Sequence, residues 1–476
     1  MMVRRDLEFL RMFYIEESRN KQILVDFPED WKLGYDLMTA ATRSFLLQHR
    51  ERERAALPVL FNIEYKQDAP AIACLRTAKI YKVDDETKNI EEDSITAELW
   101  DQVDAADRAE IAQFVNEGAF KKIHKNQITA EMTVVDARWI RKWKRHPDRS
   151  LRVKSRLCAR GFLDQQKGEL TTRSTTATRL SQRILVSHAA SDPDRTLESI
   201  DISGAFLKGF NFEQIRDALR KMGIDSPHRI VIIIPPMNVF RHLAELSDKF
   251  HIPEHQLHEY ALMAIKPIYG LNDAPLAWQL CLHNHIKDSG GQKSHLDENT
   301  FTWKENGTCI AMATTHVDDI AISAPIKWID NTNTAFTKRF GKVTRQQLPF
   351  SHCGCEYLKI KDGYKICQEE FAEKVKPAPV PNREDSSRLT REEQSQFRSI
   401  LGALLWLTAT RLDLIADISL LQSRVTVSEV KALKMANQVL EKVIEFKDVG
   451  LYYRSFKTSH QRLSSKGRNY AQEEFL

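Results

Sequence analysis

The stretch Thr308-Cys-Ile-Ala-Met-Ala-Thr-Thr-His-Val-Asp-Asp-Ile-Ala-Ile-Ser323 places two adjacent aspartates between two apolar runs. Each run has the composition of a buried strand. Because side chains alternate between the two faces of a regular strand, Asp318 and Asp319 can serve one site only where the backbone turns. The residues from His316 to Asp319 are therefore predicted to form a tight reversal at the edge of an apolar sheet.

Two carboxylates at one turn repel each other, and a multivalent cation between them relieves this repulsion. A third carboxylate, Asp201, lies at the end of the predicted strand 197–202. Together with Asp318 it would hold two Mg²⁺ ions ~4 Å apart, the arrangement that stabilises the attacking and leaving oxygens in phosphoryl transfer. An Asp-Asp pair is also ordinary turn chemistry, and the sequence does not show that residues 197–202 lie beside the turn.

The remaining pattern is mixed α and β. Pro235 and Pro236 stop an apolar run that is typical of a buried strand. Asn306-Gly307 indicates a hairpin, because both residues tolerate a positive φ. The predicted elements are a helix over 98–114, strands over 197–202, 230–234, 301–304, 308–315 and 320–323, and helices over 392–410 and 428–446.

The composition is that of a folded protein with several domains. Of 476 residues, 42% are apolar and 28% are charged, which excludes a disordered or fibrous chain. The seven cysteines are irregularly spaced, which favours a reducing compartment over a disulfide framework. The sequence has no secretory signal and no apolar run of ~20 residues, so we expect an intracellular protein, cytoplasmic or nuclear, without membrane association.

Charge is distributed unevenly along the chain, although the formal net charge is only +5. Residues 121–160 contain thirteen Lys or Arg against three Asp or Glu, and Trp139 and Trp143 lie among them. If this segment is a strand, we expect aromatic and basic side chains to share one surface, which would stack on a nucleic acid and neutralise its phosphates. A solvated charged face is the competing interpretation.

Three motifs in succession resemble the reverse transcriptase of copia-type retrotransposons. They are Asp201-Ile-Ser-Gly-Ala-Phe-Leu-Lys-Gly209, Lys266-Pro-Ile-Tyr-Gly-Leu-Asn-Asp-Ala-Pro-Leu-Ala-Trp278 and His316-Val-Asp-Asp-Ile320. Two flanking segments, 153–162 and 398–411, extend the resemblance over about residues 130–450. Each motif is weak by itself, and the shared order of all five carries the resemblance.

The resemblance implies an α+β fold in a right-hand polymerase arrangement, with fingers, a palm built on an antiparallel sheet, and a helical thumb-like segment. The expected domain boundaries are an N-terminal region of unassigned role over 1–120, fingers over 121–195, the palm over 196–376, thumb-like helices over 377–450 and a polar tail over 451–476.

The resemblance also implies an activity, that of an RNA-directed DNA polymerase, and roles for individual residues. The catalytic carboxylates would be Asp201, Asp318 and Asp319, and the same three, with the carbonyl of Ile202, would bind two Mg²⁺ ions, for which Mn²⁺ is a substitute. The expected partners are dNTPs and a primed RNA or DNA template. The nucleotide-binding residues would be Lys154 and Arg156 beside the triphosphate, Phe206 as a steric gate against a ribose 2′-hydroxyl, and Tyr269 and Gly270 beneath the nucleotide.

Three features depart from the family pattern. His316 replaces the usual Tyr, and its partial protonation beside two aspartates would make metal affinity depend on pH. Asn272-Asp273 replaces Lys-Gln, and an acid that faces a triphosphate is unfavourable unless Asp273 points away. No spaced set of four carboxylates follows the last predicted helix, so we expect no RNase H.

The sequence leaves two other functions open. A decayed retroelement remnant would bind nucleic acid without extending a primer, and a metal nuclease would use the same carboxylates for hydrolysis. Three short matches are weaker. They are a protease-like triplet at Asp288-Ser-Gly, a zinc-peptidase-like pattern over 251–255 that Pro253 interrupts, and half a zinc site at His352-Cys-Gly-Cys355.

Overall fold

The computed structural model describes residue 90, residues 95–145 and residues 150–455. These residues form two compact units. The first comprises Ala372–Thr408 and Leu412–Phe446, and the second comprises the described part of Lys82–Phe371, together with Ala409–Arg411 and residues 447–455. The expected N-terminal region before residue 90 and most of the polar tail lie outside the described residues.

The first unit is helical and contains α13 (Arg391–Leu407), α14 (Ile415–Gln422) and α15 (Val430–Glu445). Helix α13 begins at a capping box, in which Thr390 accepts from the N–H of Glu393 and the Glu393 carboxylate accepts from the N–H of Thr390. The helices predicted over 392–410 and 428–446 are confirmed. Helix α14, between them, was not predicted from the sequence.

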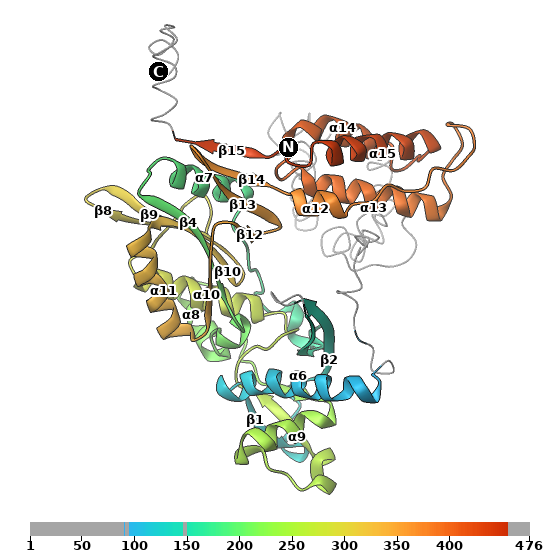
Figure 1. The fold of residues 1–476 in the computed structure, drawn as a ribbon. Coiled ribbons are helices and arrows are strands. Elements are labelled where there is room, and N and C mark those ends of the chain that lie inside the picture. The colour runs from blue at the N-terminus through green and yellow to red at the C-terminus, as the bar shows by residue number, and fades with distance from the viewer. Residues whose placement is uncertain (1–89, 91–94, 146–149, 456–476) are drawn as a thin grey trace, which may run out of the picture. The chain divides into compact units, whose positions relative to one another are not determined.

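A six-stranded antiparallel sheet in the order β11-β4-β10-β9-β8-β7 forms the centre of the second unit (Figure 1). Alternation along β10 directs Ile320 and Ile322 to one face and Ala321 to the other, so both faces are buried under helices. The strands are β4 (Arg195–Ile202), β7 (Gln292–Lys293), β8 (Thr300–Glu305), β9 (Thr308–His316), β10 (Asp319–Pro325) and β11 (Val343–Gln347).

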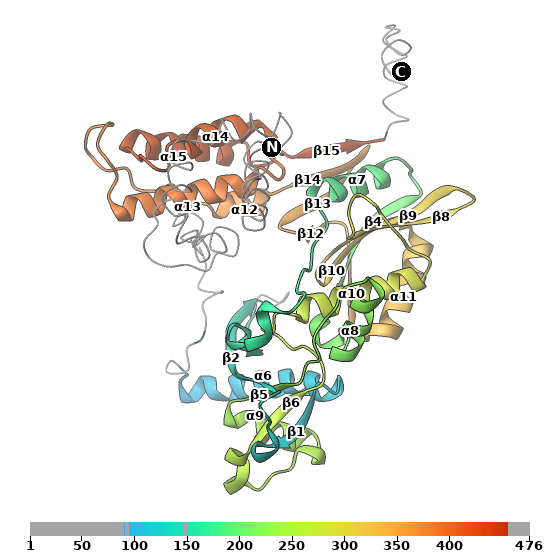
Figure 2. The same cartoon turned by 180° about the vertical axis from the view of Figure 1, so that it is seen from behind.

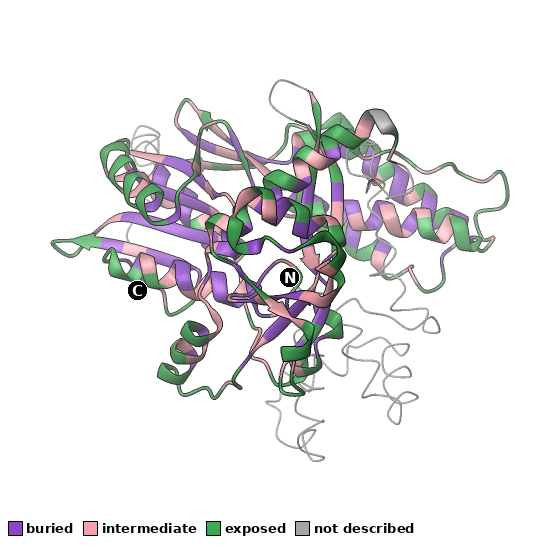
Figure 3. Cartoon of the chain, turned by 90° about the horizontal axis from the view of Figure 1, so that it is seen from below, coloured by how far each residue is buried: buried purple, intermediate pink, exposed green. Residues whose placement is uncertain are grey.

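The helices around this sheet supply the rest of its core. On the face of Ile320 and Ile322, Trp278 and Phe336 are buried; on the opposite face, Leu185 is buried against Ala321. Purple, buried positions accordingly follow the strands in Figure 3. The helices are α10 (Ala274–Asp288) and α11 (Ile326–Phe340) on the first face and α7 (Arg179–Ala190) on the second, with α8 (Phe212–Lys221) beside α10.

A five-stranded sheet in the order β1-β6-β5-β2-β3 packs against helix α6 (Ala97–Asn116), which lies beside α9 (Met237–Leu246) (Figure 2). Arg141 on β2 is buried in an ion pair with Asp107 of α6, with 2.7 Å between Nη2 and Oδ2. The strands of this five-stranded sheet are β1 (Phe120–His124), β2 (Thr133–Arg145), β3 (Leu151–Ala159), β5 (Val231–Ile234) and β6 (Tyr260–Ala264). Strands β5 and β6 lie in the range expected for the palm, yet they complete the sheet of the expected fingers.

The tryptophans of β2 share a face with the buried Arg141 and not with the exposed basic side chains, so the predicted exposed surface of mixed aromatic and basic side chains is wrong. Trp139, Arg141 and Trp143 are alternate residues of β2, so their side chains lie on the same face of the strand, on which Arg141 is buried. The indole N–H of Trp139 donates to Asn238 on α9. Strict alternation sends the intervening side chains to the opposite, exposed face. The basic side chains of that face on β2 are those of Arg138, Lys142 and Lys144.

A third sheet, antiparallel and four-stranded, has the order β12-β13-β14-β15 and also packs against α7. Its strands are β12 (Phe350–His352), β13 (Cys355–Ile360), β14 (Gly363–Cys367) and β15 (Leu451–Arg454), and the short α12 (Glu369–Lys374) follows β14. Within the described ranges, no helix has the length and apolar character needed to cross a bilayer. The expected α+β class, with an antiparallel sheet and a separate helical segment, is confirmed.

Candidate active site

Asp318 lies in a two-residue turn between β9 and β10. His316 and Asp319 pair across this hairpin, Val317 has a φ of 59°, and Asp318 is not among the described residues with a positive φ. This is the pattern of a type II′ turn, whose first central position favours glycine. Trp278, which is buried, holds the turn by donating its indole N–H to the carbonyl oxygen of Val317 at 2.6 Å.

Asp201 lies on β4, which is the strand next to β10. The register places Asp201 directly opposite Asp319, and the backbone N–H of Ile202 donates to the carbonyl oxygen of Asp318 at 3.2 Å. Asp201 and the adjacent pair Asp318-Asp319, which are more than one hundred positions apart in the sequence, therefore meet at one end of two neighbouring strands. The tight reversal predicted at residues 316–319 is confirmed, and the neighbouring strand that the sequence could not identify is β4.

The carboxylates at this end of the sheet repel one another. Burial raises the pKa of Asp201, and the charge of Asp318 raises it further. Burial together with Asp318 and Asp201 raises the pKa of Asp319 to about 6. Such crowding favours either a proton or a cation at the site.

His316 stays largely neutral in this environment. Burial lowers the pKa of its imidazole, and the neighbouring Asp318 only partly opposes this effect. The partial protonation expected from the sequence is therefore disfavoured near neutral pH.

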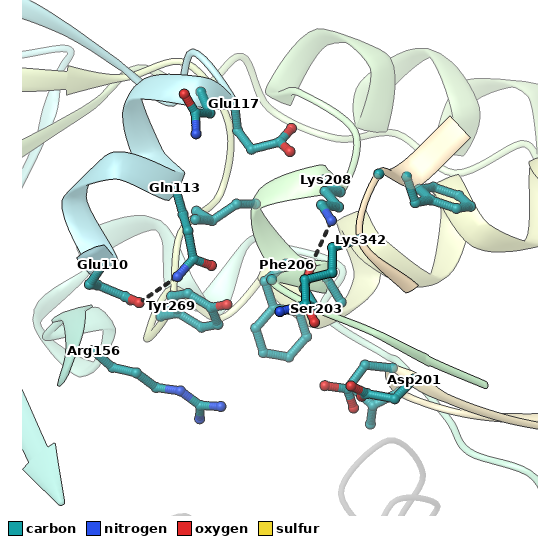
Figure 4. Close-up of a pocket in the computed structure, with 18 of the residues that line it drawn as sticks. Glu110, Gln113, Glu117, Arg156, Asp201, Ser203, Phe206, Lys208, Tyr269 and Lys342 are labelled. Atoms are coloured by element: carbon teal, nitrogen blue, oxygen red, sulfur yellow. Dashed lines mark hydrogen bonds between the residues drawn. The ribbon is translucent and has the colours of Figure 1, made fainter. Parts of the chain in front are cut away.

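A cavity of about 1020 Å³ opens beside the aspartates (Figure 4). Asp201 and Asp318 line one side of it, and Lys154 and Arg156 from β3 line another. Phe206 and Tyr269 also line this cavity, whereas Asp319, Ile202 and Gly270 do not. The structure thus brings six of the nine predicted site residues to one space.

Phe206 and Tyr269 form an aromatic wall. Their ring centroids are 5.5 Å apart, and the guanidinium of Arg156 lies 5.4 Å from the centroid of Tyr269. Phe206 belongs to a short 3₁₀ turn (Ala205–Lys208) that follows Gly204, whose φ is 69°. The wall combines an apolar surface with a cation at its edge, which suits a planar, anionic ligand.

Gly270 acts through the backbone rather than on the cavity. A Cβ at this position would lie 2.0 Å from the carbonyl oxygen of Ala159, and its φ is 93°. Beside it, the carbonyl oxygen of Tyr269 accepts from the N–H of Ala159 at 2.7 Å. Glycine therefore lets this loop lie against β3 and keeps Tyr269 next to Arg156.

Further cations around the cavity were not predicted from the sequence. Burial lowers the pKa of the Lys154 amine, and the neighbouring Arg156 and Lys144 lower it further, so the basic groups are crowded. Lys208 donates to the carbonyl oxygen of Ser203 at 2.7 Å. The additional lysines on the cavity wall are Lys144, Lys208 and Lys342, of which Lys208 lies inside a motif that the sequence analysis quoted.

Asp273 points away from the cavity. It is 4% exposed, and its Oδ2 lies 2.8 Å from Nε of Arg229, which is also buried and pairs with Asp164. Burial raises the pKa of Asp273 and Arg229 opposes this shift. The departure from Lys-Gln at this position therefore supports an internal ion pair and does not place an acid against a triphosphate.

Helix α6 also contributes to the cavity, which the sequence analysis missed. Glu110 is 4% exposed, and burial raises its pKa to about 7 against the lowering effect of Arg156 and Lys154. The only sequence signal was a carboxylate directly before Ile111 on the apolar side of a predicted helix. The residues of α6 and its C-terminal end that line the cavity are Glu110, Gln113, Asn116 and Glu117.

The carboxylates at this site fit Mg²⁺ only if phosphate oxygens of a bound ligand complete its coordination. Among the described residues, no group of three or more His, Cys, Asp or Glu side chains is arranged to hold a metal ion. Mg²⁺ is commonly held by one or two carboxylates together with substrate phosphates, and Asp201 and Asp318 provide two carboxylates facing the cavity. Within those residues, neither the pattern at 251–255 nor the motif at 352–355 forms such a group.

Comparisons with known proteins find relatives among mobile elements. The chain is 24% identical over 305 residues to the retrovirus-related Pol polyprotein from transposon RE1 of Arabidopsis thaliana, covering 60% of this chain and 18% of the relative. It is 26% identical over 302 residues to the corresponding polyprotein from transposon RE2, with the same coverage. The chain is similar to retrotransposon Pol polyproteins. The resemblance to copia-type elements is confirmed at this level.

The likeness is partial in extent. The chain spans 18% of the length of these Pol polyproteins, and no family model matches it. Among solved structures, a foamy viral protease-reverse transcriptase in complex with double-stranded DNA has a TM-score of 0.37 at 12% identity, over 70% of this chain and 46% of that one. Apo telomerase from Candida tropicalis also has a TM-score of 0.37, at 11% identity over 74% and 63%. At TM-scores this low, we draw no conclusion from the similarity to these two structures.

Proposed function

We propose that the chain is an RNA-directed DNA polymerase that transfers a deoxynucleotide from a dNTP to a primer 3′-hydroxyl. The observation that carries this proposal is the register of β4 and β10, which sets Asp201 opposite Asp319 and beside Asp318 at the edge of a cavity with basic and aromatic walls. The similarity to Pol polyproteins supports the same class of reaction.

In this proposal, each group of side chains that lines the cavity has a role in the reaction. Asp201 and Asp318 would hold two Mg²⁺ ions, which when bound lower the pKa of the attacking hydroxyl and neutralise the departing pyrophosphate. Lys154 and Arg156 would neutralise the triphosphate, and Phe206 would exclude a 2′-hydroxyl from the sugar. Asp319 raises the negative potential behind the two cavity-facing carboxylates.

The exposed basic face of β2 and β3 would contact a template backbone. Lys142 lies directly opposite Lys154, and Arg152 lies opposite Lys144, so four basic side chains gather at this end of the face. Phosphate contacts of this kind are independent of sequence and weaken with salt. In this proposal the six-stranded sheet is the palm, the five-stranded sheet the fingers and the helical unit the thumb.

Primer extension tests the proposal. Purified chain is incubated with poly(rA) primed by oligo(dT), dTTP and either Mg²⁺ or Mn²⁺, and we expect extension that is lost in Asp318→Asn. The control is Asp101→Asn, which removes an exposed carboxylate on α6 and should leave extension unchanged. Binding of the primer-template without extension by the wild-type chain would favour the decayed remnant instead.

The same substrate distinguishes a nuclease from a polymerase. Labelled primer-template is incubated with Mg²⁺ and no nucleotide, and cleavage that is lost in Asp318→Asn would support hydrolysis by these carboxylates. The aromatic wall of Phe206 and Tyr269 favours a nucleotide site, because hydrolysis of a backbone needs no surface against which a free nucleotide packs.

A further inference from the structure

Gln113, an exposed residue on α6, presents a neutral amide to the cavity. Its Nε2 donates to Oε2 of Glu110, one turn earlier on α6, at 3.3 Å (Figure 4). Above the pKa of Glu110, which is raised to about 7, its ionised carboxylate only accepts hydrogen bonds, so the NH₂ end of the amide faces Glu110 and the Oε1 acceptor faces away from it. Among the described residues, the side-chain hydrogen bond of Gln113 is the one from Nε2 to Glu110, which leaves Oε1 available as an acceptor.

Oε1 of Gln113 lies close to Gly204. A Cβ built on Gly204 would lie 2.9 Å from Oε1 of Gln113, and the φ of 69° disfavours any side chain there. The acceptor therefore lies against the loop that leads directly into Phe206. Gln113 and Phe206 reach the same part of the cavity from two different elements, helix α6 and the segment after β4.

The groups of a deoxynucleotide can be assigned to the cavity by their chemistry, and this step rests on the proposed function. The triphosphate requires the cations and the metal-binding carboxylates, and the base packs on an apolar surface. The sugar then lies near Phe206, and its only hydroxyl is the one on C3′. A neutral acceptor on the same cavity wall as Phe206 matches that hydroxyl, which is the one hydrogen-bond donor of the sugar.

We propose that Oε1 of Gln113 accepts a hydrogen bond from the 3′-hydroxyl of the incoming dNTP, and that Glu110 is the positioning residue that holds the amide. Gln113 is thereby a specificity-determining residue that distinguishes a nucleotide able to support further extension from a chain terminator.

The surroundings of Glu110 define the conditions for a test. Its Oε1 is buried and makes no hydrogen bond of normal geometry, and it faces charged or titratable groups from α6, β3 and the loop before α10. These groups are Asp107, Lys154, Arg156, Cys158 and Tyr269. Because the pKa of Glu110 is raised to about 7, the carboxylate is mainly ionised at pH 8, where the comparison is made.

The experiment deletes the hydroxyl and the amide separately. Single-nucleotide incorporation of dTTP and of 2′,3′-dideoxy-TTP is measured on poly(rA)·oligo(dT) for the wild type, Gln113→Leu and Glu110→Gln. We expect Gln113→Leu to lower kcat/KM for dTTP about three- to tenfold with little change for the dideoxy nucleotide, so that the wild-type preference collapses. Glu110→Gln should give an intermediate ratio, and Gln102→Leu, on an exposed position of the same helix, should give the wild-type ratio.

Two results would overturn the inference. An equal loss for both nucleotides in Gln113→Leu would mean a structural role, and an unchanged ratio would mean no contact. Competition of dTTP and its dideoxy analogue against a fluorescent dNTP on the chain without primer tests the contact independently of catalysis. A wild-type chain that never extends a primer yet binds dTTP more tightly than the analogue, through Gln113, would refute the polymerase proposal and keep this one.

Discussion

The indole N–H of Trp278 donates a 2.6 Å hydrogen bond to the carbonyl oxygen of Val317, and this bond joins helix α10 to the turn that carries Asp318. The positive φ of a β-branched residue costs about 1–3 kcal/mol and persists only where the surroundings enforce it. The tryptophan at the end of one motif thus stabilises the backbone of another.

Replacing Trp278 by Phe should loosen the turn. The change leaves a buried carbonyl without its donor, so we expect a loss of about 1–3 kcal/mol in the free energy of unfolding and, because Asp318 moves, at least a tenfold loss of extension rate. Urea unfolding and primer extension measure the two effects. The matched control is Trp303→Phe, which removes an indole donor from the Ser289 carbonyl in the same unit. It should lose stability without comparable loss of rate, and equal rate losses would contradict the prediction.

Asp319→Asn should stabilise the metal-free chain while it impairs catalysis. The pKa of Asp319 is raised from 3.8 to about 6, so its charge is unfavourable above about pH 6 and this penalty is absent below pH 3.8. After allowance for solvent screening we expect a gain of about 1 kcal/mol at pH 8. Thermal unfolding in EDTA at pH 8 and pH 5 measures it, and the gain should shrink at pH 5. A variant less stable than wild type at pH 8 would refute the repulsion between these aspartates.

Glu110 should make stability fall as pH rises. Its pKa is raised from 4.5 to about 7, so folding favours the protonated form, and stability is lost as pH increases from about 4.5 through 7. The full loss is roughly 3 kcal/mol, and Glu110→Gln should remove it. Urea unfolding at pH 5.5 and pH 8 should therefore show a difference between variant and wild type that widens toward pH 8. Glu131→Gln, at an exposed position, should show a constant difference.

Gly270→Ala should damage the packing of the Tyr269 loop on β3. Both the positive φ and the 2.0 Å approach to the Ala159 oxygen oppose a side chain, so we expect a loss above about 3 kcal/mol in the free energy of unfolding. Gly118→Ala separates the two causes, because Gly118 has a φ of 58° but no atom within 4 Å of its Cβ position. That variant should lose only about 1–2 kcal/mol. Similar losses in the two variants would mean that the close approach is unimportant.

Local patterns predicted the local structure well. The hairpin at Asn306-Gly307 and the reversal at residues 316–319 follow from turn chemistry and apolar runs, which need no distant partner. The order of the motifs suggested that Asp201 joins Asp318. Only the register of β4 against β10 shows it, because strand pairing over more than one hundred residues leaves no mark on composition.

The errors and omissions have physical causes of the same kind. Trp139 and Trp143 were expected beside lysines, yet alternation by two puts them on the face of Arg141. Asp273 was expected to be unfavourable beside a triphosphate, because the sequence does not show that it pairs with Arg229. Glu110 and Gln113 reach the cavity only because α6 packs on β3, a tertiary contact that helical periodicity does not encode.

The two larger sheets exchange the chain repeatedly: β1 to β3 belong to one, β4 to the other, β5 and β6 return to the first, and β7 to β11 complete the second. No single cut can separate them into independently folding fragments. During synthesis, neither sheet has all its strands until the chain has been made beyond residue 264. Strand edges of the nascent chain therefore stay unpaired until then. Assembly of this protein should thus be slow and sensitive to chaperone supply, and truncated products should aggregate.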